Sequence, residues 1–327
     1  MLKKLLFLLT IVTLPVAAKP QLTVYTYSAF AAEWGPGPAV KKAFEARCDC
    51  TLKFVALEDG VSLFNRLKME GKRGRADVAL GLDNNLLDAA RQSGLFASSG
   101  VDPHGLTLPG GWHDDIFLPY DYGWFAFVYD KTRLKNPPSS LHELIDSPQR
   151  WRVILQDPRT STPGLGMLLW MQKVWGDKAP QAWQKLARKT VTVTKGWSEA
   201  YGLFLKGEAD MVLSYTTSPA YHLIEEHSGR YAAAAFSEGH YLQVEVAAQL
   251  ASSKQPELAR QFMRFILTPD FQKTIPTGNW MYPVTDIALP EGFQSLKRPT
   301  TTLEYSPQQV NQQRAAWIQA WQRAVSR

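Results

Sequence analysis

The chain has 327 residues, with 36 basic and 30 acidic side chains and a formal net charge of +6. This excess is small and dispersed, which argues against a nucleic-acid-binding protein. The length exceeds what one hydrophobic core usually reaches, so two domains of roughly 150 residues are expected. A cleft between the two domains is then available for a ligand.

The first 18 residues have the pattern of a cleaved signal peptide. Two lysines precede an apolar run over residues 5–14, which is too short to span a bilayer. Small residues follow, and cleavage is predicted after Ala18. No cysteine stands there to carry a lipid, and no later segment is apolar enough for a membrane helix. The product is expected in the periplasm, and an uncleaved N-terminal anchor is the alternative.

Strand-like runs alternate with amphipathic helical stretches after the leader, which indicates a wound α/β fold. Strands are predicted over residues 22–27, 51–57 and 76–82, the last of them buried on both faces. A helix follows Pro36, where a first turn tolerates proline, and another begins at Gly60. These elements predict an open sheet with helices on both sides.

The alternation restarts in the second half of the chain between residues 152 and 236. Strands are predicted over residues 153–156, 191–194 and 211–215, and helices over residues 164–174, 183–189 and 198–206. Two longer strands, over residues 123–129 and 241–249, are predicted to form a hinge. Helices are expected over residues 257–267 and 307–325, with Ser306 placed to cap the latter. The fold class is therefore α/β, with two open sheets joined by hinge strands.

Cys48 and Cys50 are the only cysteines, and one residue separates them. In an oxidising compartment they could close a small ring, but so short a loop adds little loop entropy. A disulfide and two free thiols both remain open. No histidine or further cysteine stands nearby at the spacing of a metal site.

Four loops follow predicted strands, and ligands of open α/β sheets bind at the carboxyl ends of strands. The third loop, residues 157–166, allows Ser161 or Thr162 to cap a helix that opens at Pro163, with backbone donors directed at an anion. The fourth, residues 214–221, is rich in hydroxyl groups. The polar and aromatic residues of the other loops are Tyr27 and Trp34 in the first, and Asp59 and Gly60 in the second.

Trp197 and Trp280 lie in predicted turns, where core packing explains a large aromatic side chain poorly. An aromatic face attracts a flat cation, and Asp59 can supply the balancing carboxylate. Two or three such faces provide ~4 to 6 of the ~12 kcal/mol that nanomolar binding requires. Each residue also has a purely structural interpretation, as a packing tryptophan, a turn residue or a helix cap.

Long segments resemble one family closely. They include LTVYTYSAFAAEWGPGPAVKKAFE, VALEDGVSLFNRL, DPRTSTPGLGMLLWMQKVWG, VLSYTTSPAYH and IPTGNWMYPV, and the match covers nearly the whole chain after the leader. The chain resembles the thiamine-binding periplasmic proteins, the receptors of thiamine ABC transporters. The resemblance implies a two-lobed periplasmic binding protein of type II, transferrin-like fold. It also implies thiamine and its mono- and diphosphate as transported ligands, an ABC transporter permease at the inner membrane as partner, a monomer, and no cofactor.

The resemblance further implies which residues contact the ligand. Segments that match the family's contacts contain Asp59, Gly60, Ser161, Thr162, Trp197, Tyr215, Thr216, Thr217 and Ser218, and matching loops contain Tyr27, Trp34, Tyr221 and Trp280. The expected lobes are residues 19–122 with 250–282, and residues 123–249, with the C-terminal segment 283–327 unassigned. The hydroxyethyl end or its phosphate is expected near Gly60 and Ser161.

Two other functions remain as alternatives. A thiaminase-like enzyme would need a cysteine in the cleft, but Cys48 and Cys50 are predicted on the opposite side of their lobe. A receptor for another organic cation, such as a polyamine, would need several carboxylates, whereas the ligand-side loops offer one or two. Hydrolase motifs are absent, and no adjacent tyrosine pair suggests ferric ion binding.

Overall fold

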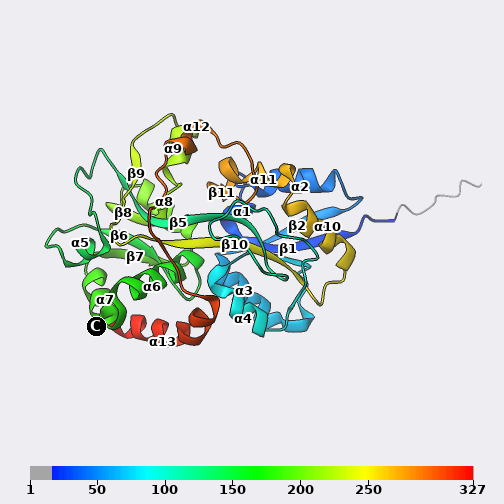
Figure 1. The fold of residues 1–327 in the computed structure, drawn as a ribbon, viewed down its shortest axis with the longest axis horizontal. Coiled ribbons are helices and arrows are strands. Elements are labelled where there is room, and N and C mark those ends of the chain that lie inside the picture. Colours follow the sequence, from blue (N-terminus) through cyan, green and yellow to red (C-terminus); the bar gives the residue numbers. More distant parts are fainter. Residues whose placement is uncertain (1–16, 327) are drawn as a thin grey trace, which may run out of the picture.

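Two long strands run through the centre of the molecule and join its two lobes (Figure 1). They are β5 (Leu118–Asp130) and β10 (His240–Leu250), which pair antiparallel. The computed structural model describes residues 17–326, so the predicted signal peptide, apart from Ala17 and Ala18, lies outside the described residues. The strands follow the order β2-β1-β3-β10-β5-β8-β6-β7, which confirms the predicted α/β class with two joined sheets.

The first sheet is buried on both faces. Every residue of β3 (Val78–Asp83) is buried, and its apolar side chains are divided between two clusters. Val78 and Leu80 pack with α2 and α10, whereas Ala79 and Leu82 pack on the face that α3 covers. The elements around this sheet are β1 (Gln21–Tyr27), α1 (Ser28–Ala31), α2 (Gly37–Glu45), β2 (Thr51–Leu57), α3 (Gly60–Glu70), α4 (Leu87–Gln92), β4 (Phe96–Ala97), α10 (Pro256–Ile266) and α11 (Pro269–Gln272).

The second sheet begins where β5 leaves the first. Phe125 to Tyr129 of β5 pair with β8, and β6 and β7 continue the sheet in parallel. Its elements are α5 (Leu141–Asp146), β6 (Val153–Gln156), α6 (Thr162–Trp175), α7 (Ala179–Ala187), β7 (Thr190–Thr194), α8 (Trp197–Leu205), β8 (Met211–Tyr215), α9 (Pro219–Glu225) and β9 (Tyr231–Ala233). The predicted strands and helices of this region are confirmed to within a few residues.

β5 begins earlier than the sequence predicts, because residues 118–122 also pair with β10. Pro119 and Asp121 are unusual in a buried strand, which is why the prediction began at Gly123. Pro119 stands opposite Val246 at a shift of register, a position at which a strand tolerates proline.

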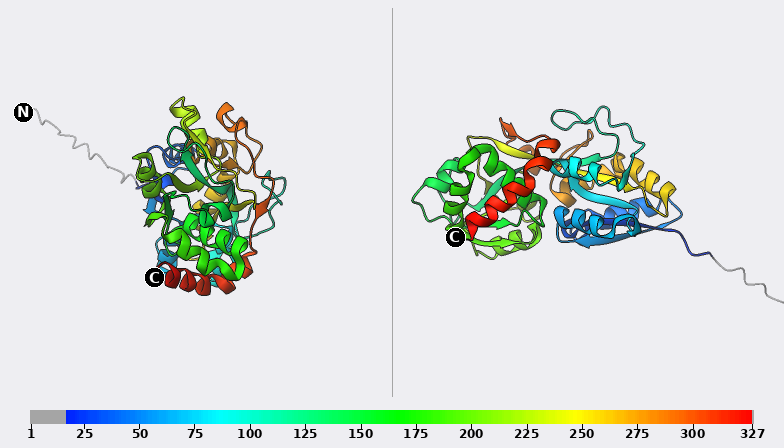
Figure 2. Two further views of the ribbon diagram at one scale, coloured as in Figure 1. Left: turned by 90° about the vertical axis from the view of Figure 1, so that its left-hand side faces the viewer. Right: turned by 90° about the horizontal axis from the view of Figure 1, so that it is seen from below.

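The C-terminal segment crosses the molecule and ends in α13 (Pro307–Val325), which the right-hand view of Figure 2 shows lying beside both lobes. This helix packs against α6 and α7 on one side and against α4 on the other. Ser306 caps it, as predicted, and forms a capping box with Gln309. Before it come β11 (Tyr282–Pro283), α12 (Glu291–Gln294) and β12 (Thr302–Leu303).

Cys48 and Cys50 form a disulfide between the end of α2 and the start of β2, which answers the question that the sequence left open. No helix within residues 17–326 combines the length and the apolar character needed to cross a bilayer.

Candidate ligand-binding site

A cavity of about 310 Å³ opens beside the long strands, a size at the lower end of known ligand pockets. Loops of both sheets contribute to its wall. Eight of the thirteen predicted contact residues line it, namely Tyr27, Trp34, Asp59, Trp197, Tyr215, Ser218, Tyr221 and Trp280. The sequence interpretation did not single out Tyr201, Glu245, Asn279 and Met281, which also line it.

Aromatic rings form much of the wall. Trp34 follows α1 and is 53% exposed, and its ring centroid lies 6.3 Å from that of Trp197 on the other sheet. Trp197 in turn stacks on Tyr201 at 5.0 Å. Because these rings come from both sheets, a flat ligand between them would contact both lobes at once.

Trp197 is not a turn residue, contrary to the prediction. It is the first residue of α8, with Gly196 as the N-cap, and its indole Nε1 donates to Ser214 Oγ at 2.8 Å. Tyr201 stands one helical turn further on, so the i, i+4 spacing places both rings on one face. That spacing, visible in the sequence, was the signal that would have identified Tyr201.

Trp280 lies on the other side of the cavity and has a left-handed backbone, with φ of 56°. Such a conformation is uncommon outside glycine and is often found at functional sites. Thr217 Oγ1 donates to the carbonyl oxygen of Trp280 at 2.6 Å, and the Tyr221 ring packs edge-on at 5.3 Å. Thr217 therefore positions Trp280 instead of lining the cavity.

In the loop of residues 214–221, some of the other predicted contact residues line the cavity and one lies in the interior. Ser218 lines the cavity and shares a hydrogen bond with Ser214. Tyr215 lines it too, and its hydroxyl donates to Gln243 Oε1 at 2.5 Å. Thr216 does not line the cavity, and its buried hydroxyl has no hydrogen-bond partner among the described residues.

Asp59 is buried at the point where three helices begin. Its carboxylate accepts hydrogen bonds from Gly60 N of α3 and from Trp197 N of α8, at 2.9 and 3.3 Å. The hydroxyls of Ser161 and Thr162, at the start of α6, donate to it at 2.8 and 3.3 Å. The carboxylate therefore ties α3 of the first sheet to two helices of the second.

Burial raises the pKa of Asp59 from 3.8 to about 6, and the four donors oppose that rise. Asp59 is therefore mostly ionised at neutral pH. The positive ends of the three helix dipoles lie around the charge and compensate it.

Gly60, Ser161 and Thr162 do not line the cavity, and the donors expected to face a ligand anion instead bind Asp59. Gly60 is required where it stands, because a Cβ there would lie 2.5 Å from Gly81 O and from Thr162 Cγ2. In this structure these three residues form the connection between the sheets next to the cavity.

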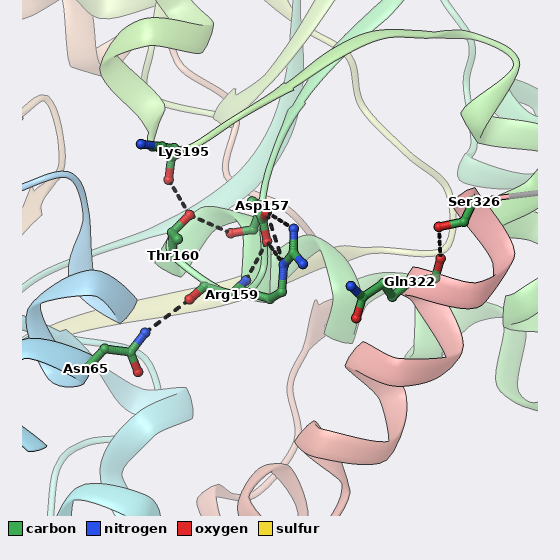
Figure 3. A network of polar contacts seen from close by, with 7 residues as sticks. All are labelled: Asn65, Asp157, Arg159, Thr160, Lys195, Gln322 and Ser326. Atoms are coloured by element: carbon green, nitrogen blue, oxygen red, sulfur yellow. Dashed lines mark hydrogen bonds and ion pairs between the residues drawn. The ribbon is translucent and has the colours of Figure 1, made fainter. Parts of the chain in front are cut away.

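Further contacts between the sheets continue beyond Asp59 (Figure 3). Asn65 Nδ2 of α3 donates to the carbonyl oxygen of Arg159 at 3.2 Å, and Ser62 N donates to that of Thr160 at 2.9 Å. Thr160 also donates to the carbonyl oxygen of Lys195 at 2.7 Å, as Figure 3 shows. The loop after β6 is therefore held against α3 by backbone and side-chain hydrogen bonds.

Glu245 is a buried acid in the middle of the apolar strand β10. It is the register partner of Asp121 on β5, which is also buried. Asn279 Nδ2 donates to both carboxylates, at 2.6 Å to Asp121 and 3.0 Å to Glu245. An acid within a predicted strand of mostly apolar residues was the sequence signal for this part of the site.

The lining residues contain carboxylates but no lysine, arginine or histidine. Glu58, Asp59 and Glu245 all reach the cavity, which is more than the one or two carboxylates expected from the loops. The sequence analysis used a low number of carboxylates as an argument against a polyamine. With three carboxylates at the cavity, that number alone no longer argues against one. Aromatic rings and negative charge together suit an organic cation.

Neither cysteine lines this cavity, and both are bonded to each other. Within residues 17–326 no group of three or more metal-ligating side chains gathers. The described residues thus offer the cavity no thiol nucleophile.

An α/β fold of two lobes with such a cavity defines a solute-binding protein of the ABC-importer type, and the profile of the family described as "Bacterial extracellular solute-binding protein" matches residues 19–273. Proteins called "Thiamine-binding periplasmic protein" from Salmonella typhimurium strain LT2 and Escherichia coli strain K12 are each 72% identical over 327 residues, covering 100% of both chains. A solved structure called "Periplasmic thiamin binding protein" is also 72% identical, with a TM-score of 0.93 over 94% of this chain and 97% of that one. The chain therefore belongs to the family of thiamine-binding periplasmic proteins, whose place is the periplasm.

Proposed function

We propose that the protein is the periplasmic receptor for thiamine, which it delivers to an ABC importer. The observation that carries this proposal is the cavity wall, in which tryptophan and tyrosine rings from both sheets stand beside carboxylates and no basic group is present. Thiamine consists of two flat rings, one of them a permanent cation. The relatives described above are named for the same ligand.

The aromatic rings are the proposed seat of the two thiamine rings. Each desolvated contact between a cation and a ring is worth ~0.5 to 2 kcal/mol, so several rings supply a substantial part of the binding free energy. The hydroxyethyl arm is proposed to point towards Asp59. Thiamine monophosphate and thiamine diphosphate are proposed as further ligands.

Capture is proposed to occur by closure of two lobes, residues 19–122 with 250–282 and residues 123–249, about the strands β5 and β10. The bonds that Ser62 and Asn65 donate to the loop after β6, and those that Asp59 accepts from Ser161 and Thr162, then hold the closed form. In this division α13 belongs to neither lobe alone, because it packs on α4 as well as on α6 and α7. The receptor is proposed to act as a monomer that docks on a permease at the inner membrane.

Titration of the tryptophan fluorescence tests this function. The mature protein is first unfolded and refolded, so that ligand carried through purification is removed. Thiamine, thiamine monophosphate and thiamine diphosphate are expected to quench the emission, since the cavity contains three tryptophans. Spermidine is expected to have no effect, and a response to spermidine alone would identify a polyamine receptor instead.

A thiaminase activity is tested on the same preparation. Thiamine is incubated with the protein and a base acceptor, and the expected result is that it remains intact. Turnover would show that the protein is an enzyme.

A further inference from the structure

Asp121 and Glu245, of which Glu245 lines the cavity, form a pair of acids without a counter-charge among the described residues. Asp121 and Glu245 are adjacent on β5 and β10, and both are at least nine-tenths buried. Within residues 17–326 the donors to the pair carry no charge: the amide of Asn279 donates to both carboxylates, and the phenol of Tyr27 also bonds Glu245. Two ionised carboxylates so close together in a buried place would repel each other strongly.

The groups around the pair do not change this balance. They are the phenols of Tyr27 on β1, Tyr120 on β5 and Tyr215 on β8, and the acids Asp83 on β3 and Asp59 before α3. Burial raises the pKa of all three phenols well above its usual range, so they stay neutral. In the part of the chain that the structure describes, no cation is among the groups that act on Asp121 or Glu245, and Arg314 interacts with Asp83 instead.

One oxygen of the pair also needs a proton. Asp121 Oδ1 is buried and has no hydrogen-bond partner if both groups are ionised. A buried acceptor without a partner costs about 1 to 3 kcal/mol or more. A proton carried by Glu245 and donated to Asp121 would satisfy that oxygen and remove the repulsion.

Resting on the proposed function, we propose that Asp121 and Glu245 hold one proton between them, so that the pair gives the cavity one negative charge, which receives the cationic ring of the ligand. Asp59 does not have this role, because three helix N-termini already compensate its charge. The pair is thus the uncompensated anion of the site. It matches the single positive charge of thiamine.

Titration behaviour agrees with the geometry. Burial, followed by the neighbouring Asp121, raises the pKa of Glu245 well above its usual range. Burial raises the pKa of Asp121 to about 6, while its hydrogen bond to Glu245 opposes the rise. Glu245 is accordingly the protonated partner and Asp121 the ionised one at neutral pH.

Charge counting by amide substitution tests the proposal. Glu245→Gln and Asp121→Asn each leave one carboxylate, so each single variant is expected to bind thiamine within about threefold of the wild type near pH 7.5. The double variant E245Q/D121N has no charge left and is expected to lose more than about tenfold in affinity. If E245Q alone loses that much, the pair carries two charges and the proposal is wrong. If the double variant binds like the wild type, the pair is not the anion of the site, and the proposal is also wrong.

E208Q/D121N is the matched control for the double variant. It also removes two acids, but Glu208 is exposed beyond the end of α8, does not line the cavity, and has a charge that solvent screens. Its affinity is expected to stay close to that of D121N. A loss equal to that of E245Q/D121N would mean that total charge, and not the pair, governs binding.

Infrared spectroscopy gives a readout that does not depend on binding or on the double variant folding. Near pH 7.5 the wild type is expected to show the C=O stretch of a protonated carboxylic acid, and E245Q is expected to lack it. Absence of this band in the wild type would overturn the proposal. If the wild type fails to bind thiamine at all, the proposed function fails, whereas binding together with a missing band rejects only the shared proton.

Discussion

Asp59 and Glu245 line the same cavity, yet their surroundings differ in kind. Asp59 stands where three helices begin and accepts four hydrogen bonds from backbone and hydroxyl donors. Glu245 stands in mid-strand beside Asp121, and its hydrogen-bond donors, the amide of Asn279 and the phenol of Tyr27, carry no charge. Both carboxyl groups are buried, so burial by itself does not decide their charge.

The two carboxyl groups differ in the protein groups that replace water around them. Preorganised donors and helix dipoles solvate Asp59 and keep it ionised at neutral pH, although burial raises its pKa to about 6. At Glu245 the replacement is another carboxylate, which makes the protonated form the stable one. Asp59 therefore connects the lobes, whereas Glu245 is part of the acid pair whose charge is proposed to face the ligand.

The largest expected effect is on the pH dependence of stability. Because the folded pKa of Asp59 is raised from 3.8 to about 6, the folded protein holds a proton in that pH range that the unfolded chain has lost. Stability from this group therefore falls as the pH rises from about 4 to 6, by about 3 kcal/mol in all. The free energy of unfolding of ligand-free D59N, relative to wild type, is expected to increase by about that amount between pH 4 and 7.5. Urea melts at both pH values measure it, and a relative stability that does not change with pH would mean that Asp59 has an ordinary pKa.

The next effect is on thiamine affinity. Asp59→Ala leaves the donors at the starts of α3, α6 and α8 without their acceptor and removes the link between the lobes. Buried donors without partners cost about 1 to 3 kcal/mol, so a loss of roughly a hundredfold, about 2.7 kcal/mol, is expected. Fluorescence titration measures it, and D59N, which keeps one acceptor oxygen, should lose less. Equal affinity in wild type and D59A would show that Asp59 does not connect the lobes.

Asp59 and Glu245 also show how much of the site could be predicted from the sequence. Asp59 was found because it stands in a loop after a strand, before a helix with recognisable caps, and such local patterns also gave the strands and helices with few errors. Its partners were not foreseen, because the bond from Ser161 to Asp59 joins residues 102 apart in the chain. The cap pattern and the family resemblance both supplied Ser161 as a candidate, but not the group that it binds.

Glu245 was missed for a physical reason. Its strand was predicted, but the charge of a buried carboxyl group depends on the side chains of the neighbouring strand. The register of β10 on β5 sets the pairing of Glu245 with Asp121. Pro119 and Asp121 also made the start of β5 look like a loop. Register between distant strands is not a local property, so this half of the site became visible only in three dimensions.

A smaller effect is expected at Trp280, which follows the residue that bonds the acid pair. Trp280→Ala removes one aromatic face and is expected to weaken thiamine binding by roughly tenfold, about 1.4 kcal/mol. Trp280→Phe keeps a ring on the same left-handed backbone and should recover most of the affinity. Calorimetric titration of both variants distinguishes the two cases. If the phenylalanine variant is as weak as the alanine variant, the loss comes from the backbone next to Asn279 and not from the ring.

The smallest expected effect concerns the connection beyond Asp59. Asn65 donates to the carbonyl oxygen of Arg159 across the two sheets, at an exposed position where a hydrogen bond contributes about 0.5 to 1 kcal/mol. If this bond forms only in the closed protein, Asn65→Ala should raise the dissociation rate of thiamine about threefold and leave the association rate unchanged. Stopped-flow fluorescence resolves the two rates. Gln92→Ala is the matched control, since Gln92 Nε2 donates to Asp88 at 2.9 Å within the single helix α4 and should alter neither rate. Unchanged rates in N65A would instead mean that this contact already exists in the open protein, so that Asp59 and Ser62 hold the lobes closed around the ligand without it.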